Sequence, residues 1–287
     1  MKKIIFLLLL VSSLLIVSCQ ETAQRGAEIN YKLGFSDLEI SSLGNKEEYQ
    51  DQRLELPISI HNTLAYDIEN VAVSVQGFDT HYVELYSSRE QLSNLEGKSI
   101  FNPEGREERI LFEGTVKKLL PGASKELQNY RVYAYFNSKV EFSPTVCVTS
   151  QQAGYVGAAY DTYQGACAFE KEVSYSEGQG APLGITNLEL IPRQGRQIEL
   201  RMRVENKGKG KVGKISLATA TLGGKPLSCD FRADTEEEGF SFEPEEKSAT
   251  LLCAGALAAD ETYRTPLYLE LLYDYELDVK ETLTILE

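Results

Sequence analysis

Imidazole and carboxylate side chains are the first groups to inspect for catalysis or metal binding, and the chain has only two histidines, His61 and His81. Asp79 lies two residues before His81, so a metal site would have to bring both histidines and this carboxylate together. The apolar and polar residues before His61 alternate, which places it on the solvent face at a strand end, and His81 falls in a loop. We therefore predict two unrelated surface histidines and no metal site.

Sequence motifs for common catalytic sites do not support an enzyme. The chain lacks the Gly-x-Ser-x-Gly spacing of a serine hydrolase and the His-Glu-x-x-His spacing of a zinc protease. We predict a noncatalytic protein without a cofactor. An enzyme of unrecognised type is the third functional hypothesis, after the two binding functions given below. The formal net charge of −14 repels phosphate groups, so nucleic acid is not an expected partner.

Two further groups of residues are candidates for binding. Tyr155, Tyr160, Tyr163 and Tyr175 crowd one segment among small residues; they form either a contact surface or the packing of a long loop onto its own domain. The acidic stretch from Asp234 to Glu246 offers oxygen ligands for calcium, but it lacks the Asp-x-Asp-x-Asp-Gly spacing. A solvated acidic loop is the preferred interpretation.

The N-terminus predicts export. Lys2 and Lys3 precede an apolar run, and Ile16-Val17-Ser18-Cys19 closes the segment, which is typical of a secretory leader. This ending resembles the lipobox of prokaryotic lipoproteins. The resemblance implies cleavage after residue 18, a lipid on Cys19 that anchors the protein to the membrane, and a flexible tether over 19–30. An uncleaved anchor, or an ordinary leader that leaves a free thiol, are the alternatives.

The other cysteines agree with an oxidising compartment. Cys147, Cys167, Cys229 and Cys253 allow three connectivities, and no Cys-x-x-Cys spacing indicates a redox or zinc role. Pairing neighbours, 147 with 167 and 229 with 253, keeps each bridge inside one half of the chain. We predict these two structural disulfides over free thiols.

An internal duplication is the most informative feature for the fold. Four segments recur in the same order: 33–40 as 183–190, 54–62 as 198–206, 112–116 as 253–257, and 130–131 as 263–264. The separation falls from 150 to 133 residues along the series. We infer two copies of one domain, over 31–177 and 182–287, joined by a linker at 178–181.

Both copies read as β-structure. Ile198, Leu200, Met202 and Val204 alternate with polar residues, as a strand with one buried face requires. Further strands are predicted at 71–76, 109–117, 130–136, 145–149, 214–221, 249–253, 266–275 and 281–286. Short strands between Gly- and Pro-containing turns predict two antiparallel β-sandwiches. Pro57 cannot donate to a ladder, so its strand should form an edge there or carry a bulge.

Residues 197–208, which end in Val204-Glu205-Asn206-Lys207-Gly208, resemble the second strand of immunoglobulin-like CARDB and S-layer-associated domains. The resemblance covers about half of each copy, and the first copy departs from it because Leu64 replaces the glycine. It implies tandem immunoglobulin-like sandwiches used for adhesion, display or spacing on cell surfaces.

Two functional hypotheses follow. The leading one is a lipid-anchored surface protein that spaces or presents a binding surface to a protein or cell-envelope partner. The alternative is a small-ligand- or metal-binding lipoprotein that serves a transporter or envelope complex. A deep pocket between the copies would favour the alternative, and filled sandwiches with shallow surfaces would favour the first.

Overall fold

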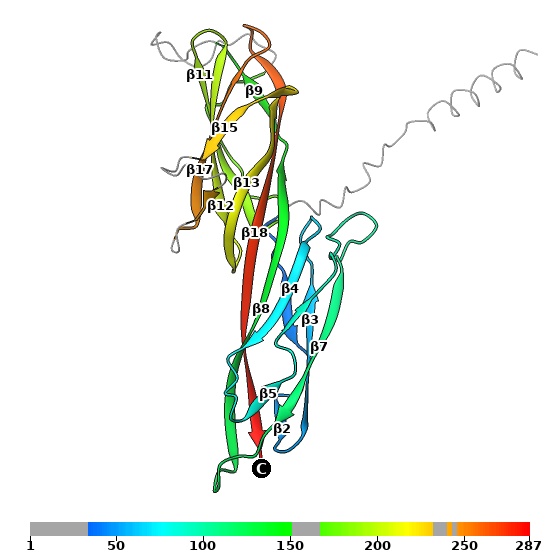
Figure 1. Cartoon of the computed structure of the whole chain (residues 1–287). Coiled ribbons are helices and arrows are strands. Elements are labelled where there is room, and N and C mark those ends of the chain that lie inside the picture. Colours follow the sequence, from blue (N-terminus) through cyan, green and yellow to red (C-terminus); the bar gives the residue numbers. More distant parts are fainter. Residues whose placement is uncertain (1–33, 151–166, 232–239, 243–245) are drawn as a thin grey trace, which may run out of the picture. The chain divides into compact units, whose positions relative to one another are not determined.

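The computed structural model describes residues 34–150, 167–231, 240–242 and 246–287 (Figure 1). Every regular element in these ranges is a β-strand, which confirms the all-β prediction. None of the described residues belongs to a helix long and apolar enough to cross a membrane.

The strands of the N-terminal half include all those expected from the sequence. They are β1 (Glu39–Ser42), β2 (Glu47–Tyr49), β3 (Arg53–His61), β4 (Glu69–Gln76), β5 (Val83–Leu85), β6 (Arg89–Gln91), β7 (Glu107–Val116), β8 (Lys125–Phe142) and β9 (Thr145–Val148). The prediction underestimated β8, which has 18 residues.

The C-terminal half begins with a short strand and ends with the longest one. Its strands are β10 (Glu172–Ser174), β11 (Leu183–Arg193), β12 (Gln197–Asn206), β13 (Lys211–Leu222), β14 (Lys225–Pro226), β15 (Ser228–Phe231), β16 (Phe240–Ser241), β17 (Ser248–Ala256) and β18 (Tyr263–Leu286). The segments predicted as separate strands at 266–275 and 281–286 are both part of β18.

The described strands form three sheets. One sheet has the order β1-β3-β7-β5 and a second has the order β10-β11-β12-β17-β15. The third has the order β14-β13-β18-β8-β4-β6 and contains strands from both halves of the chain. Side chains from all three sheets meet in a single cluster of buried apolar residues. The sandwich architecture is therefore present, but its core is continuous.

The pair β8–β18 joins the two halves. It is antiparallel over 18 residue pairs, from Leu269 opposite Phe142 to Leu286 opposite Lys125 (Figure 1). β4 adds to β8 on one side, and β13 adds to β18 on the other. Residues 277–286, which belong to the second copy in sequence, therefore pair entirely with the first half.

Pairing registers support the central part of the duplication. Leu54 lies opposite Gly114 in β3–β7, and Ile198 lies opposite Gly255 in β12–β17. The duplication matches Leu54 with Ile198 and Gly114 with Gly255, at separations of 144 and 141 residues. The sequence alignment of 54–62 and 112–116 with their counterparts therefore agrees with the register of the strands.

The outer two matches do not keep this register. Leu190 was matched with Ile40, yet Ile40 lies opposite Ile60 and Leu190 lies opposite Leu200, which is not the counterpart of Ile60. Tyr130 lies within β8, whereas Tyr263 begins β18. A bulge in β11 and the different strand lengths shift these segments by several residues, which short sequence matches cannot reveal.

The asparagine at the end of the repeated strand has the same role in both copies. Asn206 Oδ1 accepts from the amide of Gly208 at 3.0 Å, and its Nδ2 donates to the carbonyl of Gly210 at 2.9 Å. Asn62 makes the equivalent bonds to Leu64 N and Tyr66 O, at 3.1 and 3.0 Å. The side chain thus closes the turn after the strand, and this requires no glycine.

Gly208 is needed for a different reason. A Cβ at this position would lie 2.1 Å from the Tyr275 hydroxyl oxygen and 2.5 Å from the Pro182 Cβ. In the first copy, Leu64 fills the equivalent place and is fully buried. The copies therefore diverge here because the second turn packs against the junction between the halves.

That junction contains the segment predicted as a linker. Gly180 N donates to Gly34 O and Gly180 O accepts from Ala65 N, each at 2.7 Å. Gln179 and Ala181 are buried, and Gln179 exchanges two side-chain hydrogen bonds with the backbone of Ile185. A free hinge at 178–181 does not fit these contacts.

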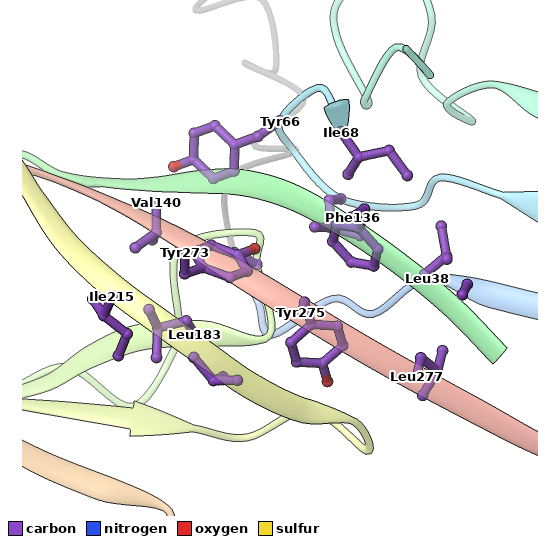
Figure 2. Packing of buried hydrophobic residues seen from close by; sticks show 14 of the residues in the cluster. Leu38, Tyr66, Ile68, Phe136, Val140, Leu183, Ile215, Tyr273, Tyr275 and Leu277 are labelled. Atoms are coloured by element: carbon purple, nitrogen blue, oxygen red, sulfur yellow. The ribbon is translucent and has the colours of Figure 1, made fainter. Parts of the chain in front are cut away.

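Apolar packing continues across the same junction. Figure 2 shows Leu38, Phe136, Leu183, Tyr275 and Leu277, from both halves, in one buried cluster. All described residues lie within one compact unit, Tyr31–Glu287. Two tandem, independently packed immunoglobulin-like domains are therefore not confirmed, because the halves share a sheet and a core.

Pro57 lies where its missing donor does no harm. β1 pairs with β3 only from His61 to Ile58, and the next residue, Pro57, accepts from Leu43 N through its carbonyl. The N and C=O of one residue point to the same neighbouring strand, so the nitrogen of Pro57 faces the end of β1. β3 is an interior strand between β1 and β7, so the expected edge is present only locally, where the ladder with β1 ends at Ile58.

Both predicted disulfides are present. Cys147 in β9 is bonded to Cys167, and Cys229 in β15 is bonded to Cys253 directly opposite it in β17. Each links residues of one half, as the spacing indicated. Their presence is consistent with an extracytoplasmic protein.

Asp37 places a carboxylate in the junction. Its Oδ2 accepts from Lys209 N at 2.7 Å and from the Tyr275 hydroxyl at 3.1 Å. Burial raises the pKa of Asp37 above its usual value, and these hydrogen bonds only partly offset that effect. Because the folded state holds the proton more tightly, Asp37 contributes stability at low pH that is lost as pH rises through the raised pKa.

We therefore expect Asp37→Asn to change the pH dependence of stability. Above the usual aspartate pKa of about 3.9, the free energy of unfolding of the wild type should fall with pH relative to that of the variant. Urea unfolding of both proteins at intervals between about pH 4 and 7 measures this difference. A constant difference across the range would show that Asp37 titrates as it does in the unfolded chain.

Candidate functional site

The side of β8–β18 that faces away from the core is a polar surface shared by the two halves. Burial alternates strictly along β8, and nearly so along β18, so every second side chain points outward. We call this surface the outer face. It comprises Arg131, Tyr133, Tyr135, Asn137, Lys139 and Glu141 of β8, with Glu270, Leu272, Asp274, Glu276, Asp278 and Lys280 of β18.

Amides and a carboxylate form a chain of hydrogen bonds across the middle of the outer face. Asn70 Nδ2 donates to Asn137 Oδ1 at 2.7 Å, and Asn137 Nδ2 donates to Asp274 Oδ1 at 2.5 Å. Asn70 has a positive φ of 52°, a conformation that asparagine tolerates better than most residues. This series of hydrogen bonds fixes the orientation of each side chain and leaves the remaining donors and acceptors of these side chains for other molecules.

Two tyrosines lie beside this series of hydrogen bonds. The rings of Tyr133 and Tyr135 are 6.2 Å apart between centroids and only 16° from parallel. Burial, and then the nearby charge of Glu276, raise the pKa of Tyr135, so its hydroxyl stays protonated near neutral pH. Arg131 on the same strand donates to Asp278 Oδ2 at 2.6 Å.

Charges at the other end of the outer face are also paired. Lys139 lies 2.8 Å from Glu141 and 3.6 Å from Glu270, and contact with Glu141 raises the lysine pKa. The Tyr268 hydroxyl donates to Glu270 at 2.8 Å, which raises the tyrosine pKa to about 12. These groups hold one another in place, but the outer face as a whole has five carboxylates against three cationic side chains.

Three half-open hollows follow the outer face. The first, of about 760 Å³, is bordered by Arg131, Tyr133 and Lys280. The second, of about 510 Å³, is bordered by Tyr135, and the third, of about 550 Å³, by Lys214 and Leu272. The second and third share Asn70, Asn137 and Asp274. We call the outer face and these hollows the track.

A second exposed feature is an ordered turn in the N-terminal half. Ser99 and Asn102 exchange two backbone hydrogen bonds, and the Ser99 hydroxyl accepts from the amides of Phe101 and Asn102. The turn holds Ile100 at 62% exposure and Phe101 at 92%. Two large apolar side chains fixed in solvent offer a contact point for another macromolecule.

The two histidines contact different residues. His61, at the end of β3, is 2.8 Å from Glu104 O and 3.3 Å from Glu39 Oε2. His81 is exposed and contacts Asp79. In the part of the chain that the structure describes, no three His, Cys, Asp or Glu side chains group as a metal site would require.

The structure describes only some of the other candidate residues from the sequence. Tyr175 is half-buried, and its ring packs edge-on against Phe142 at 4.7 Å, so it packs the loop onto the core. Cys19, Tyr155, Tyr160, Tyr163 and most of the Asp234–Glu246 stretch lie outside the described residues.

The sequence also contains a glycine spacing that the structure explains. Gly208, Gly210 and Gly213 match the Gly-x-Gly-x-x-Gly spacing of dinucleotide-binding loops. They belong to the turn and the start of β13, however, and no helix follows. The helix N-terminus that receives a pyrophosphate is therefore missing from this segment.

Sequence reasoning missed the track. Residues 130–137 read Tyr-Arg-Val-Tyr-Ala-Tyr-Phe-Asn, with aromatic side chains on both faces of one strand. Tyrosines at alternate positions on the polar face were a usable signal. The partners Asn70 and Asp274 are far away in sequence, so only the fold brings them to Asn137.

Comparisons with known proteins leave the family open. No protein-family model and no curated protein matches the chain. Among solved structures, sporulation control protein Spo0M from Bacillus subtilis is 10% identical with a TM-score of 0.20, over 59% of this chain and 80% of that one. The secreted serine protease VesC from Vibrio cholerae is 8% identical with a TM-score of 0.24, and the alignment covers 85% of this chain and 50% of the protease. These likenesses carry no inference about function, and the CARDB resemblance stays a prediction.

Proposed function

We propose that this protein is a noncatalytic, exported, lipid-anchored protein that presents the track to a partner in the cell envelope. One observation carries the proposal: the β8–β18 ladder continues through both halves and backs the track with a filled core. The inward-facing side chains are almost completely buried. Such a sheet holds its outward side chains in fixed positions, which favours recognition of an extended ligand.

The alternative is a binding protein for one small molecule. The hollow beside Lys214 and Leu272 has a volume of about 550 Å³, within the range of small-ligand sites. It is half-open, however, and it continues into the next hollow through shared residues. This continuity favours a ligand that extends along the sheet.

Anchoring is tested by Cys19→Ser. Without the thiol no thioether to lipid can form, so the variant should leave the detergent phase in phase separation or accumulate with its leader attached. The wild type should partition into detergent and incorporate radiolabelled fatty acid. Cys147→Ser serves as the control, because it removes a thiol that is part of a disulfide and should not change lipidation. Unchanged partitioning of Cys19→Ser would overturn the anchoring part of the proposal.

A further inference from the structure

We propose that the track binds an unbranched, electrically neutral oligosaccharide, with Tyr133 and Tyr135 as its central contacts. This inference deepens the proposed function and rests on it. It depends on three features of the described residues: the tyrosine pair, the fixed polar groups around it, and a surplus of carboxylates along the track that disfavours an anionic ligand.

The tyrosine rings suit the apolar faces of sugars. The Tyr133 and Tyr135 rings are nearly parallel neighbours, and Tyr133 lines one hollow while Tyr135 lines another. The C–H groups on one face of a pyranose are weakly positive, and the face of an aromatic ring is negative. Each ring can therefore receive one sugar unit, while its hydroxyl remains in water.

The polar groups suit sugar hydroxyls. A hydroxyl both donates and accepts, so it is best satisfied by amides and carboxylates placed together. Asn70, Asn137 and Asp274 supply this combination on one side of the tyrosines, and Arg131 with Asp278 supplies it on the other. Since these groups already hold one another, binding requires little additional ordering of side chains.

The charges favour a neutral ligand. Arg131 is paired with Asp278, and Lys139 is paired with Glu141 and Glu270. Asp274, Glu276 and Asp278 follow one another at outward positions of β18 and leave a surplus of carboxylates on the outer face. This surplus repels an acidic polymer, so the track suits a neutral chain better than an anionic one.

The length of the track favours an oligomer. From Arg131 to Lys139 the strand advances eight residues at about 3.3 Å each, which gives about 26 Å and space for about five sugar units. Of the three half-open hollows along this stretch, the second and third share Asn137, whereas the first shares no lining residue with them. A single sugar would use only one of them.

The test uses the full-length, lipid-bearing protein in a detergent without a sugar headgroup. An array of neutral linear hexasaccharides (glucan, mannan, galactan and chitin types) is compared with uronic-acid and sulfated chains, and a positive probe is titrated by calorimetry. We expect at least one neutral hexasaccharide to bind, its monosaccharide to bind far more weakly, and Kd to change less than about two-fold between about 0.05 and 0.5 M NaCl.

Variants locate the site. Tyr133→Ala and Tyr135→Ala should each weaken binding about ten-fold, whereas Tyr135→Phe keeps the ring and should stay within about three-fold. Tyr86→Ala is the matched control, because Tyr86 is an exposed tyrosine of the N-terminal half that does not line the track. Thermal unfolding of each variant verifies that it is folded.

Several outcomes would overturn the inference. They are the absence of binding to every neutral hexasaccharide, binding only to charged chains or basic peptides, and equal losses for Tyr86→Ala and Tyr133→Ala. If no sugar binds but Cys19 is lipidated and the protein is in the membrane, the proposed function remains and the partner would be a protein. If sugar binds but Cys19 is not lipidated, only the anchoring part of the proposed function is wrong.

Discussion

Deletion of residues 277–287 is expected to unfold the N-terminal half of the protein, although these residues belong to the second copy in sequence. They supply the strand that pairs with residues 125–134 of β8. They also bury Leu277, Leu283 and Ile285, each at 5% exposure or less. Burial of such side chains contributes about 1.5–3 kcal/mol each. Their sum is comparable to the total stability of a typical domain.

The measurement is hydrogen exchange of peptides from β3, β7 and β8, read by mass spectrometry on the full-length and shortened proteins. We expect protection of all three strands to be lost in the shortened protein. If only peptides of residues 182–276 lost protection, the halves would be independent domains after all.

Point variants test the same strand in the intact chain. Leu283→Ala should reduce the free energy of unfolding by about 2–5 kcal/mol, because it leaves a cavity in a filled core. Thr284→Ala, its neighbour on the opposite face of β18, should change it by less than about 0.5 kcal/mol. Comparison of the two variants separates the contribution of the buried Leu283 side chain from the contribution of strand pairing.

Local patterns in the sequence predicted the strands, but they did not predict that the two halves share a sheet and a core. Alternation at Ile198–Val204 identified β12, and cysteine spacing identified both bridges, because these signals lie within one element or one half. The sequence prediction divided β18 into strands at 266–275 and 281–286 and left residues 276–280 between them unassigned. In the structure Glu276, Asp278 and Lys280 are outward side chains of a strand that continues because β8 pairs with it.

The candidate site shows the same limit. Tyr133 and Tyr135 are visible in the sequence as alternating aromatic residues, but their hollows need β13 and β18 beside them. The segment 178–181 contains glycines and precedes a proline, so composition alone indicated a linker. Its hydrogen bonds to Gly34 and Ala65 depend on residues more than 100 positions away.

Asn62→Ala is expected to destabilise the protein more than the equivalent substitution of the asparagine in the second copy. Asn62 is fully buried, and its Nδ2 donates to Tyr66 O at 3.0 Å and to Leu95 O at 2.9 Å. Its Oδ1 accepts from Leu64 N at 3.1 Å. Alanine would remove three hydrogen bonds from the interior, each contributing about 0.5–1.5 kcal/mol, although Leu95 O keeps its bond from Ile68 N at 3.0 Å. We expect a loss of about 1.5–4.5 kcal/mol in urea unfolding.

The second copy supplies the graded comparison. Asn206 makes two such bonds, to Gly208 N and Gly210 O, and its side chain is slightly more exposed. Asn206→Ala should therefore cost less than Asn62→Ala, and Asn94→Ala, an exposed asparagine, should cost almost nothing. Asn62→Asp keeps the acceptor for Leu64 N but turns a carboxylate oxygen toward two carbonyls, so it should be at least as damaging as alanine. Equal effects of Asn62→Ala and Asn94→Ala would mean that the asparagine does not hold the turn. In that case, the shared asparagine of the two copies would have no structural role.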